Sequence, residues 1–144
     1  MKIILVCGGR FFSAQWAVEK ALDDLTPEAV MQGGCPSGAD WLAKNYARER
    51  GLPGIEVEAN WDYYGRSAGP RRNAWMALLK PTVVLAMPGG TGTANSVQRS
   101  QNNLQPPSTQ KRPHTECTHA SALRRFGACI QPMTIHTGRL TPAV

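Results

Sequence analysis

The sequence predicts a single doubly wound α/β domain, built on a parallel sheet and followed by an irregular basic tail. Two continuous apolar runs, 2–7 and 82–87, are typical of strands that helices cover on both faces. Strand-like, glycine-rich and helical segments recur in that order along the chain, as in units with crossover helices. No apolar run approaches the roughly 18 residues of a membrane-spanning helix, and no secretion signal is evident.

Local patterns place the individual elements. We expect strands over 2–7, 28–32, 55–59 and 82–87, and helices over 14–25, from about 41 to 50, over 70–79 and after the glycine turn at 89–93. Ser13 is the expected N-cap of the first helix. Residues 55–59 alternate between apolar and acidic, which indicates an edge strand with one solvent-exposed face. The aromatic segment 60–69 is expected to be a loop that either folds over a ligand or packs on the surface.

Glycine-rich turns follow three of the expected strands, at 8–10, 33–40 and 89–93. In an open parallel sheet, ligands bind outside the carboxyl ends of the strands, where the winding reverses. The three turns would therefore meet around one shared opening at the carboxyl ends of the strands, the mouth of the site. A helix capped by Thr93 would direct its positive end into the same turn, where an anion would bind. The alternative is a tight turn that binds nothing.

Four short motifs carry a resemblance to a known family. They are Cys7-Gly8-Gly9-Arg10-Phe11, the segment Gly33-Gly34-Cys35-Pro36-Ser37-Gly38-Ala39-Asp40, the helix start Gly69-Pro70-Arg71-Arg72-Asn73-Ala74-Trp75-Met76, and Pro88-Gly89-Gly90-Thr91-Gly92-Thr93-Ala94. With these motifs in this order, residues 1–99 resemble the SLOG superfamily of Rossmann-like proteins, and within it the YspA-like branch. The resemblance implies a nucleotide or nucleotide-derived ligand, often bound by a dimer, and leaves residues 100–144 as a separate irregular tail.

Carried over by position, the resemblance implies a role for each motif. Residues 89–93 would hold a phosphate, Arg72 would lie near the ribose-phosphate, and Asp40 would face the sugar or only stabilise its own helix. The full set of expected ligand-binding residues is Gly8, Gly9, Arg10, Phe11, Gly33, Gly34, Ser37, Gly38, Asp40, Arg72, Asn73, Pro88, Gly89, Gly90, Thr91, Gly92 and Thr93. No catalytic residue is assigned.

One departure from the resemblance bears on catalysis. Relatives that hydrolyse the N-glycosidic bond of nucleoside monophosphates carry a glutamate three residues after the second threonine, where this chain has Ser96. A hydroxyl cannot activate water as a carboxylate does. A phosphoribohydrolase or nucleoside-transfer enzyme using Asp40 or Asp62 therefore remains the first alternative to simple binding.

No cofactor or metal is indicated. The glycine turns match neither the dinucleotide fingerprint nor a phosphate loop ending in Gly-Lys-Ser/Thr. Cys117, His119, Cys129 and His136 offer zinc-compatible side chains, but at irregular spacing. The four cysteines contain no Cys-x-x-Cys pair, so we expect reduced thiols and a cytoplasmic protein.

The net charge of +6 resides mostly in the tail. Residues 1–95 hold ten basic and nine acidic side chains, whereas residues 96–144 hold six basic side chains and one acidic. The second alternative, a single-stranded nucleic-acid binder, is therefore not favoured, because the core offers little electrostatic attraction for a phosphate backbone.

The tail lacks the fifth strand that the resemblance leads us to expect. Without that strand, 82–87 would lie at an edge although its composition is that of a covered strand. Three candidates for a cover are residues 129–135 added as an edge strand, a second subunit, or nothing, in a tail altered by a reading-frame change. We expect residues 102–128 to be largely irregular.

Overall fold

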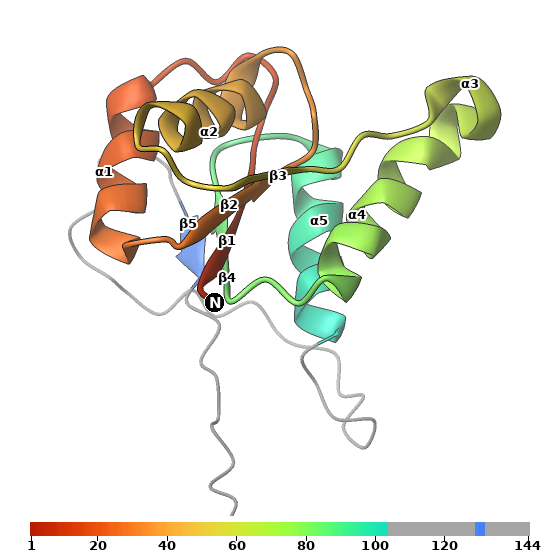
Figure 1. Ribbon diagram of the computed structural model, residues 1–144. Coiled ribbons are helices and arrows are strands. Elements are labelled where there is room, and N and C mark those ends of the chain that lie inside the picture. Colours follow the sequence, from red (N-terminus) through yellow and green to blue (C-terminus); the bar gives the residue numbers. More distant parts are fainter. Residues whose placement is uncertain (104–128, 132–144) are drawn as a thin grey trace, which may run out of the picture.

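The computed structural model describes residues 1–103 and 129–131, and Figure 1 shows their arrangement. The elements are β1 (Ile3–Cys7), α1 (Gln15–Leu25), β2 (Ala29–Gln32), α2 (Gly38–Glu49), β3 (Gly54–Glu56), α3 (Trp61–Tyr64), the 3-10 turn η1 (Gly65–Ser67), α4 (Ala68–Leu78), β4 (Val83–Ala86), α5 (Thr91–Asn102) and β5 (Cys129–Gln131). The expected fold class is confirmed: the chain forms a Rossmann-like α/β domain.

The sheet has the strand order β3-β2-β1-β4-β5, and its first four strands are parallel. The chain winds outward from β1 to β3, then returns to place β4 on the other side of β1. The winding therefore reverses between β1 and β4. β3 lies at one edge, as its alternating sequence predicts.

Helices cover both faces of the sheet. Successive residues of β1 point to opposite faces, so Ile4 packs with Leu22 of α1 on one face. On the other face, Leu5 packs with Met76 of α4. The continuous apolar strands thus serve two cores at once, which explains why they show no alternation (Figure 1).

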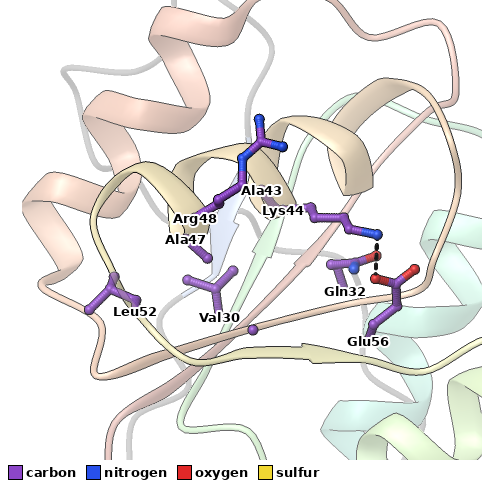
Figure 2. Close-up of a pocket in the computed structure, with 9 residues that line it drawn as sticks. Val30, Gln32, Ala43, Lys44, Ala47, Arg48, Leu52 and Glu56 are labelled. Atoms are coloured by element: carbon purple, nitrogen blue, oxygen red, sulfur yellow. Dashed lines mark ion pairs between the residues drawn. The ribbon is translucent and has the colours of Figure 1, made fainter.

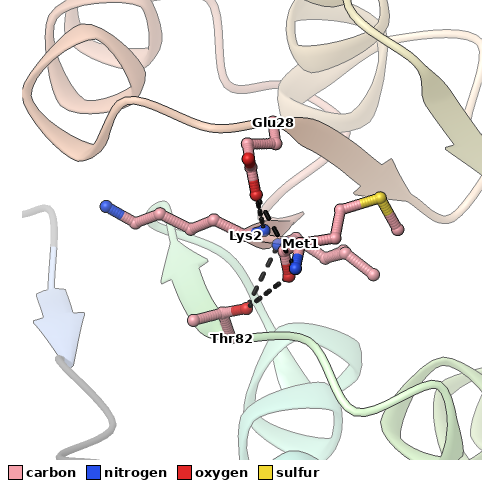
Figure 3. Close-up of polar contacts among 5 residues, drawn as sticks. Met1, Lys2, Glu28 and Thr82 are labelled. Carbon is pink, nitrogen blue, oxygen red and sulfur yellow. Dashed lines mark hydrogen bonds and ion pairs between the residues drawn. The ribbon is translucent and has the colours of Figure 1, made fainter.

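Polar contacts tie the amino ends of three strands together. The Glu28 carboxylate, just before β2, accepts the Lys2 backbone N–H and lies 3.7 Å from the N-terminal ammonium group. Thr82, just before β4, accepts the Ile3 N–H at 3.1 Å through its hydroxyl (Figure 3). These contacts hold the amino-terminal ends of β1, β2 and β4 together.

Two local expectations are wrong. The first helix begins at Gln15 with Ala14 at its N-cap position, so Ser13 does not cap it. Residues 61–67 form α3 and η1 rather than a loop. A side-chain cap accounts for the helix, because Asn60 Oδ1 accepts the Tyr63 N–H at 3.0 Å.

β5 pairs antiparallel with β4, with Leu85 opposite Ile130. The first of the three candidates, an edge strand added from residues 129–135, therefore covers β4. The structure describes residues 129–131 of it. Helix α5 continues to Asn102, beyond the expected domain boundary at residue 99. The expected irregular segment 102–128 lies almost wholly outside the described residues, and the division at 99/100 stays a prediction.

Deleting residues 104–144 should increase self-association. The deletion preserves α5 but removes β5, leaving the outer N–H and C=O groups of β4 available to another chain. Sedimentation velocity would compare the truncated and full-length chains. If the truncated chain forms no larger species than the full-length chain, β5 does not protect this edge.

Candidate ligand site at the carboxyl ends of the strands

The turn after β1 joins the turn after β4. Gly9 N–H donates to Pro88 O at 2.9 Å, one step beyond the last strand bond, in which Met87 N–H donates to Cys7 O at 2.8 Å. The two glycine turns therefore continue the pairing of β1 and β4 past the end of the sheet. They meet where the winding reverses, which is the usual ligand position in this class of sheet.

The turn after β2 reaches the same point. Ala39, in the first turn of α2, donates its N–H to Gly9 O at 3.3 Å. Gly38 has φ +72, and a Cβ atom added there would lie 2.2 Å from Gly9 O. Only glycine allows this approach together with this backbone conformation. The predicted meeting of the three turns is thus present in the structure.

The glycine turn after β4 leads directly into a helix. α5 begins at Thr91 with Gly90 at its N-cap position, so Thr93 lies in the first turn and is not the cap. A Cβ atom added at Gly89 would lie 2.2 Å from Thr93 Oγ1 and 2.7 Å from Gly9 N. One added at Gly90 would meet no atom of the described residues within 4 Å. The turn is therefore closed toward β1 and open at Gly90, beside the unpaired N–H groups that begin a helix.

A groove of about 370 Å³ starts at this turn and continues along α5. It is bounded by the end of β4, by Pro88, Gly89 and Gly90, and by Thr93, Ala94 and Val97 of the helix. Its volume falls at the lower end of the range typical of small-molecule sites. The groove has room for a ligand that extends beyond a phosphate group.

Two neighbouring residues of α4 connect the turns to each other. The Arg72 guanidinium group donates to Gly33 O, and its Nε donates to Asn73 Oδ1 at 3.0 Å. Asn73 is buried, and its Nδ2 donates to Gly92 O at 3.2 Å and to Asn95 Oδ1 at 3.1 Å. Arg72 thus holds the turn after β2, while Asn73 holds the first turns of α5. Arg72 is only half-buried, and its remaining N–H groups are available for an anion.

Asp40 lies beneath the turn after β2. It is 7% exposed, and its Oδ2 accepts the Cys35 N–H at 3.3 Å. Burial raises the pKa of the Asp40 carboxyl, although the Cys35 hydrogen bond and the Arg72 charge oppose the rise. The structure therefore gives Asp40 a role in holding its own loop; contact with a sugar stays a prediction.

The raised pKa of Asp40 gives a test of its charge state. The folded protein holds this proton more tightly than the unfolded chain, so ionisation of Asp40 costs stability as the pH rises through its folded-state pKa. Asp40→Asn keeps an oxygen for Cys35. We expect its stability relative to wild type to improve from pH 4 to pH 7, measured by urea unfolding at each pH. A constant difference would contradict the assignment.

Other expected ligand residues lie at the rim. Arg10, Ser37 and Thr91 are exposed, and Phe11 is 91% exposed. The aromatic helix α3 stands away from the sheet, and Trp61 in it is exposed (Figure 1). Arg71 turns outward and stacks 4.6 Å from the centroid of the Tyr64 ring.

Sequence reasoning missed the polar groups buried beneath the mouth. Ser96 and Ser100 are each 2% exposed, and their Oγ atoms have no hydrogen-bond partner among the residues that the structure describes. Ser96 lies beside the Cys7 thiol, whose pKa burial raises to about 12. Their four-residue spacing on α5 was the available signal, because such residues share a helix face. Cys7 and Cys35 are free thiols, whereas Cys117, His119 and His136 lie outside the described residues.

The described residues contain neither a metal-binding cluster nor a membrane-spanning helix. Among residues 1–103 and 129–131, no group of three or more His, Cys, Asp or Glu side chains could hold a metal ion. No helix in this part of the chain is both long enough and apolar enough to cross a membrane. The expected cytoplasmic location stays a prediction.

The fold and the mouth define the class: a Rossmann-like α/β domain whose glycine turns meet at its topological switch point. Residues 2–64 match the model of the family described as YspA, cpYpsA-related SLOG family. The matched segment contains β1, the turn after β2 and all of α2. A comparison with curated proteins finds no match. The resemblance to the YspA-like branch of the SLOG superfamily is confirmed.

Proposed function

We propose that this protein binds a nucleotide or a nucleotide-derived small molecule at the carboxyl ends of β1, β2 and β4, as a sensor or as a sequestering protein. One observation carries the proposal. Gly9 bonds to Pro88 on one side and to Ala39 on the other, which joins three glycine turns at the point where the winding reverses. The match of residues 2–64 to a SLOG family supports a nucleotide-derived ligand.

Each part of the mouth suits one part of a nucleotide. The open Gly90 and the first turn of α5 offer backbone N–H groups and the positive end of a helix to a phosphate. Arg72, fixed by Gly33 and Asn73, adds a charged donor whose orientation is already set. The loop from Gly33 to Asp40 provides backbone close to the sugar. A homodimer, which the resemblance implies, is part of this proposal.

The serine at position 96 supports binding of the nucleotide without its hydrolysis. The side chain at this position faces the closed interior beside Cys7, not the open mouth. A carboxylate introduced there by Ser96→Glu would be buried at considerable cost, so we expect loss of stability before any gain of catalysis. Asp40 and Asp62, the acids considered as alternatives, have no identified catalytic partner among the described residues.

The test has a binding part and a chemical part. Mass spectrometry of the small molecules released on denaturation would identify a copurified ligand. Calorimetry with AMP, ADP and inorganic phosphate should then show that the nucleotides bind more tightly than phosphate alone. A steep fall in oligonucleotide affinity with salt, abolished by removing the basic tail residues, would instead support nucleic-acid binding.

We expect AMP incubated with the protein to be recovered unchanged, because Ser96 cannot replace the carboxylate that assists cleavage. Chromatography for free adenine over several hours checks this result. Release of adenine that is lost in Asp40→Asn or Asp62→Asn would move the assignment to a phosphoribohydrolase. Release that persists in both variants would point to a contaminating enzyme.

A further inference from the structure

We propose that Gln32 is a positioning residue: it holds the loop from Gly33 to Asp40 in its binding conformation and is itself held by the Lys44–Glu56 ion pair. The inference rests on the proposed function, since it concerns the same mouth. It assigns a task to three side chains from β2, α2 and β3 that do not themselves face the mouth.

Gln32 has an unusual place for an amide side chain. It ends β2 and is 3% exposed, among the apolar residues that form the sheet. Its Oε1 accepts the backbone N–H of Gly34. Gly34 has φ +74, and a Cβ atom added there would lie 2.9 Å from Glu58 Cγ. The loop therefore leaves the strand through a left-handed residue whose amide is fixed by Gln32.

An ion pair lies beside Gln32. Lys44 Nζ lies 2.8 Å from Glu56 Oε2, and Glu56 is the direct neighbour of Gln32 in the parallel pairing of β2 and β3. The Lys44 ammonium group lowers the pKa of Glu56, and the nearby Gln32 amide acts in the same direction. Figure 2 shows these three side chains together at one end of a pocket of about 230 Å³ under α2.

These side chains form a row that leads to the ligand loop. Lys44 pairs with Glu56, Glu56 lies beside Gln32 in the register of the two strands, and Gln32 fixes Gly34. The carbonyl of the same peptide group, Gly33 O, accepts from Arg72 on the other face of the sheet. The loop is thus held from both faces. Removing the Gln32 acceptor would leave the Gly34 N–H unpaired, and the loop would move to find a partner.

Gln32→Met tests the proposal, because it keeps the side-chain length and removes the acceptor. We expect faster amide hydrogen exchange at Gly34 and Cys35, and AMP affinity lowered about fivefold to twentyfold, as for a lost hydrogen bond. Glu49→Gln is the matched control, since it removes a carboxylate from the exposed end of α2. It should change neither measurement.

A second set of variants separates positioning from general stability. Glu56→Gln removes the charged neighbour of Gln32, so AMP binding should weaken and exchange at Gly34 should become faster. Lys44→Met removes the other half of the ion pair and should change both measurements in the same direction. Lys20→Met removes an exposed ion pair on α1 and should change neither.

Unchanged exchange at Gly34 in both Gln32→Met and Glu56→Gln would overturn the proposal. So would equal effects of Lys44→Met and Lys20→Met on exchange at Gly34. If Gln32→Met does not fold, Glu56→Gln and Lys44→Met decide. If wild-type protein binds no AMP, the proposed function fails for this nucleotide, and the exchange data still decide the role of Gln32.

Discussion

Replacing Gly90 by valine should abolish nucleotide binding and leave the fold intact. A Cβ atom at this position meets no atom of the described chain within 4 Å, so the larger side chain would project into the open space of the turn. That space is where a phosphate would approach the first N–H groups of α5. We expect calorimetry to show AMP affinity reduced by at least about 100-fold, which corresponds to ~2.7 kcal/mol.

The matched control is Gly54→Val. Gly54 also has open space around an added Cβ, but it lies at the amino-terminal end of β3, away from the mouth. This variant should bind AMP as wild type does. Equal affinity in wild type and Gly90→Val would place the ligand elsewhere, and equal losses in both variants would indicate a general effect of valine.

Arg72→Ala is the second change with a large expected effect. It removes a charged donor that Gly33 and Asn73 hold at the mouth, so we expect AMP binding to weaken by ~1.5–3 kcal/mol. Unfolding by urea should also show a loss of stability, because Gly33 O loses its donor.

Arg71→Ala provides the comparison for Arg72. It removes the same charge from the preceding residue, whose guanidinium group stacks on Tyr64 and is exposed. We expect a small effect on AMP affinity, and one that added salt screens. Equal losses from the two substitutions would mean that total charge, and not the fixed position of Arg72, determines binding.

Much of the framework could be predicted from the sequence because its signals are local. The apolar run in β1 indicates a strand covered on both faces, and the glycines that follow β1, β2 and β4 mark the turns. The known geometry of parallel sheets then brings those turns together. The edge position of β3 likewise follows from its alternating pattern.

The connections within the site could not be predicted in this way. The bond from Arg72 to Gly33 depends on how α4 packs across the sheet, and the pairing of Gln32 with Glu56 depends on the register of β2 and β3. The inward direction of Ser96 depends on where α5 begins. Each of these is set by tertiary packing, to which residue patterns give only an indirect guide.

The most direct test of the account is a map of backbone amide chemical shifts during titration of ¹⁵N-labelled protein with AMP. We expect saturable shifts concentrated at Gly9, at Gly33 and Gly34, and from Gly89 to Thr93. The amide shifts of Glu28 and Thr82, at the amino-terminal ends of the strands, should stay unchanged. Shifts confined to other surfaces, or the absence of any saturable shift with every nucleotide in the calorimetry panel, would contradict a nucleotide site at this mouth.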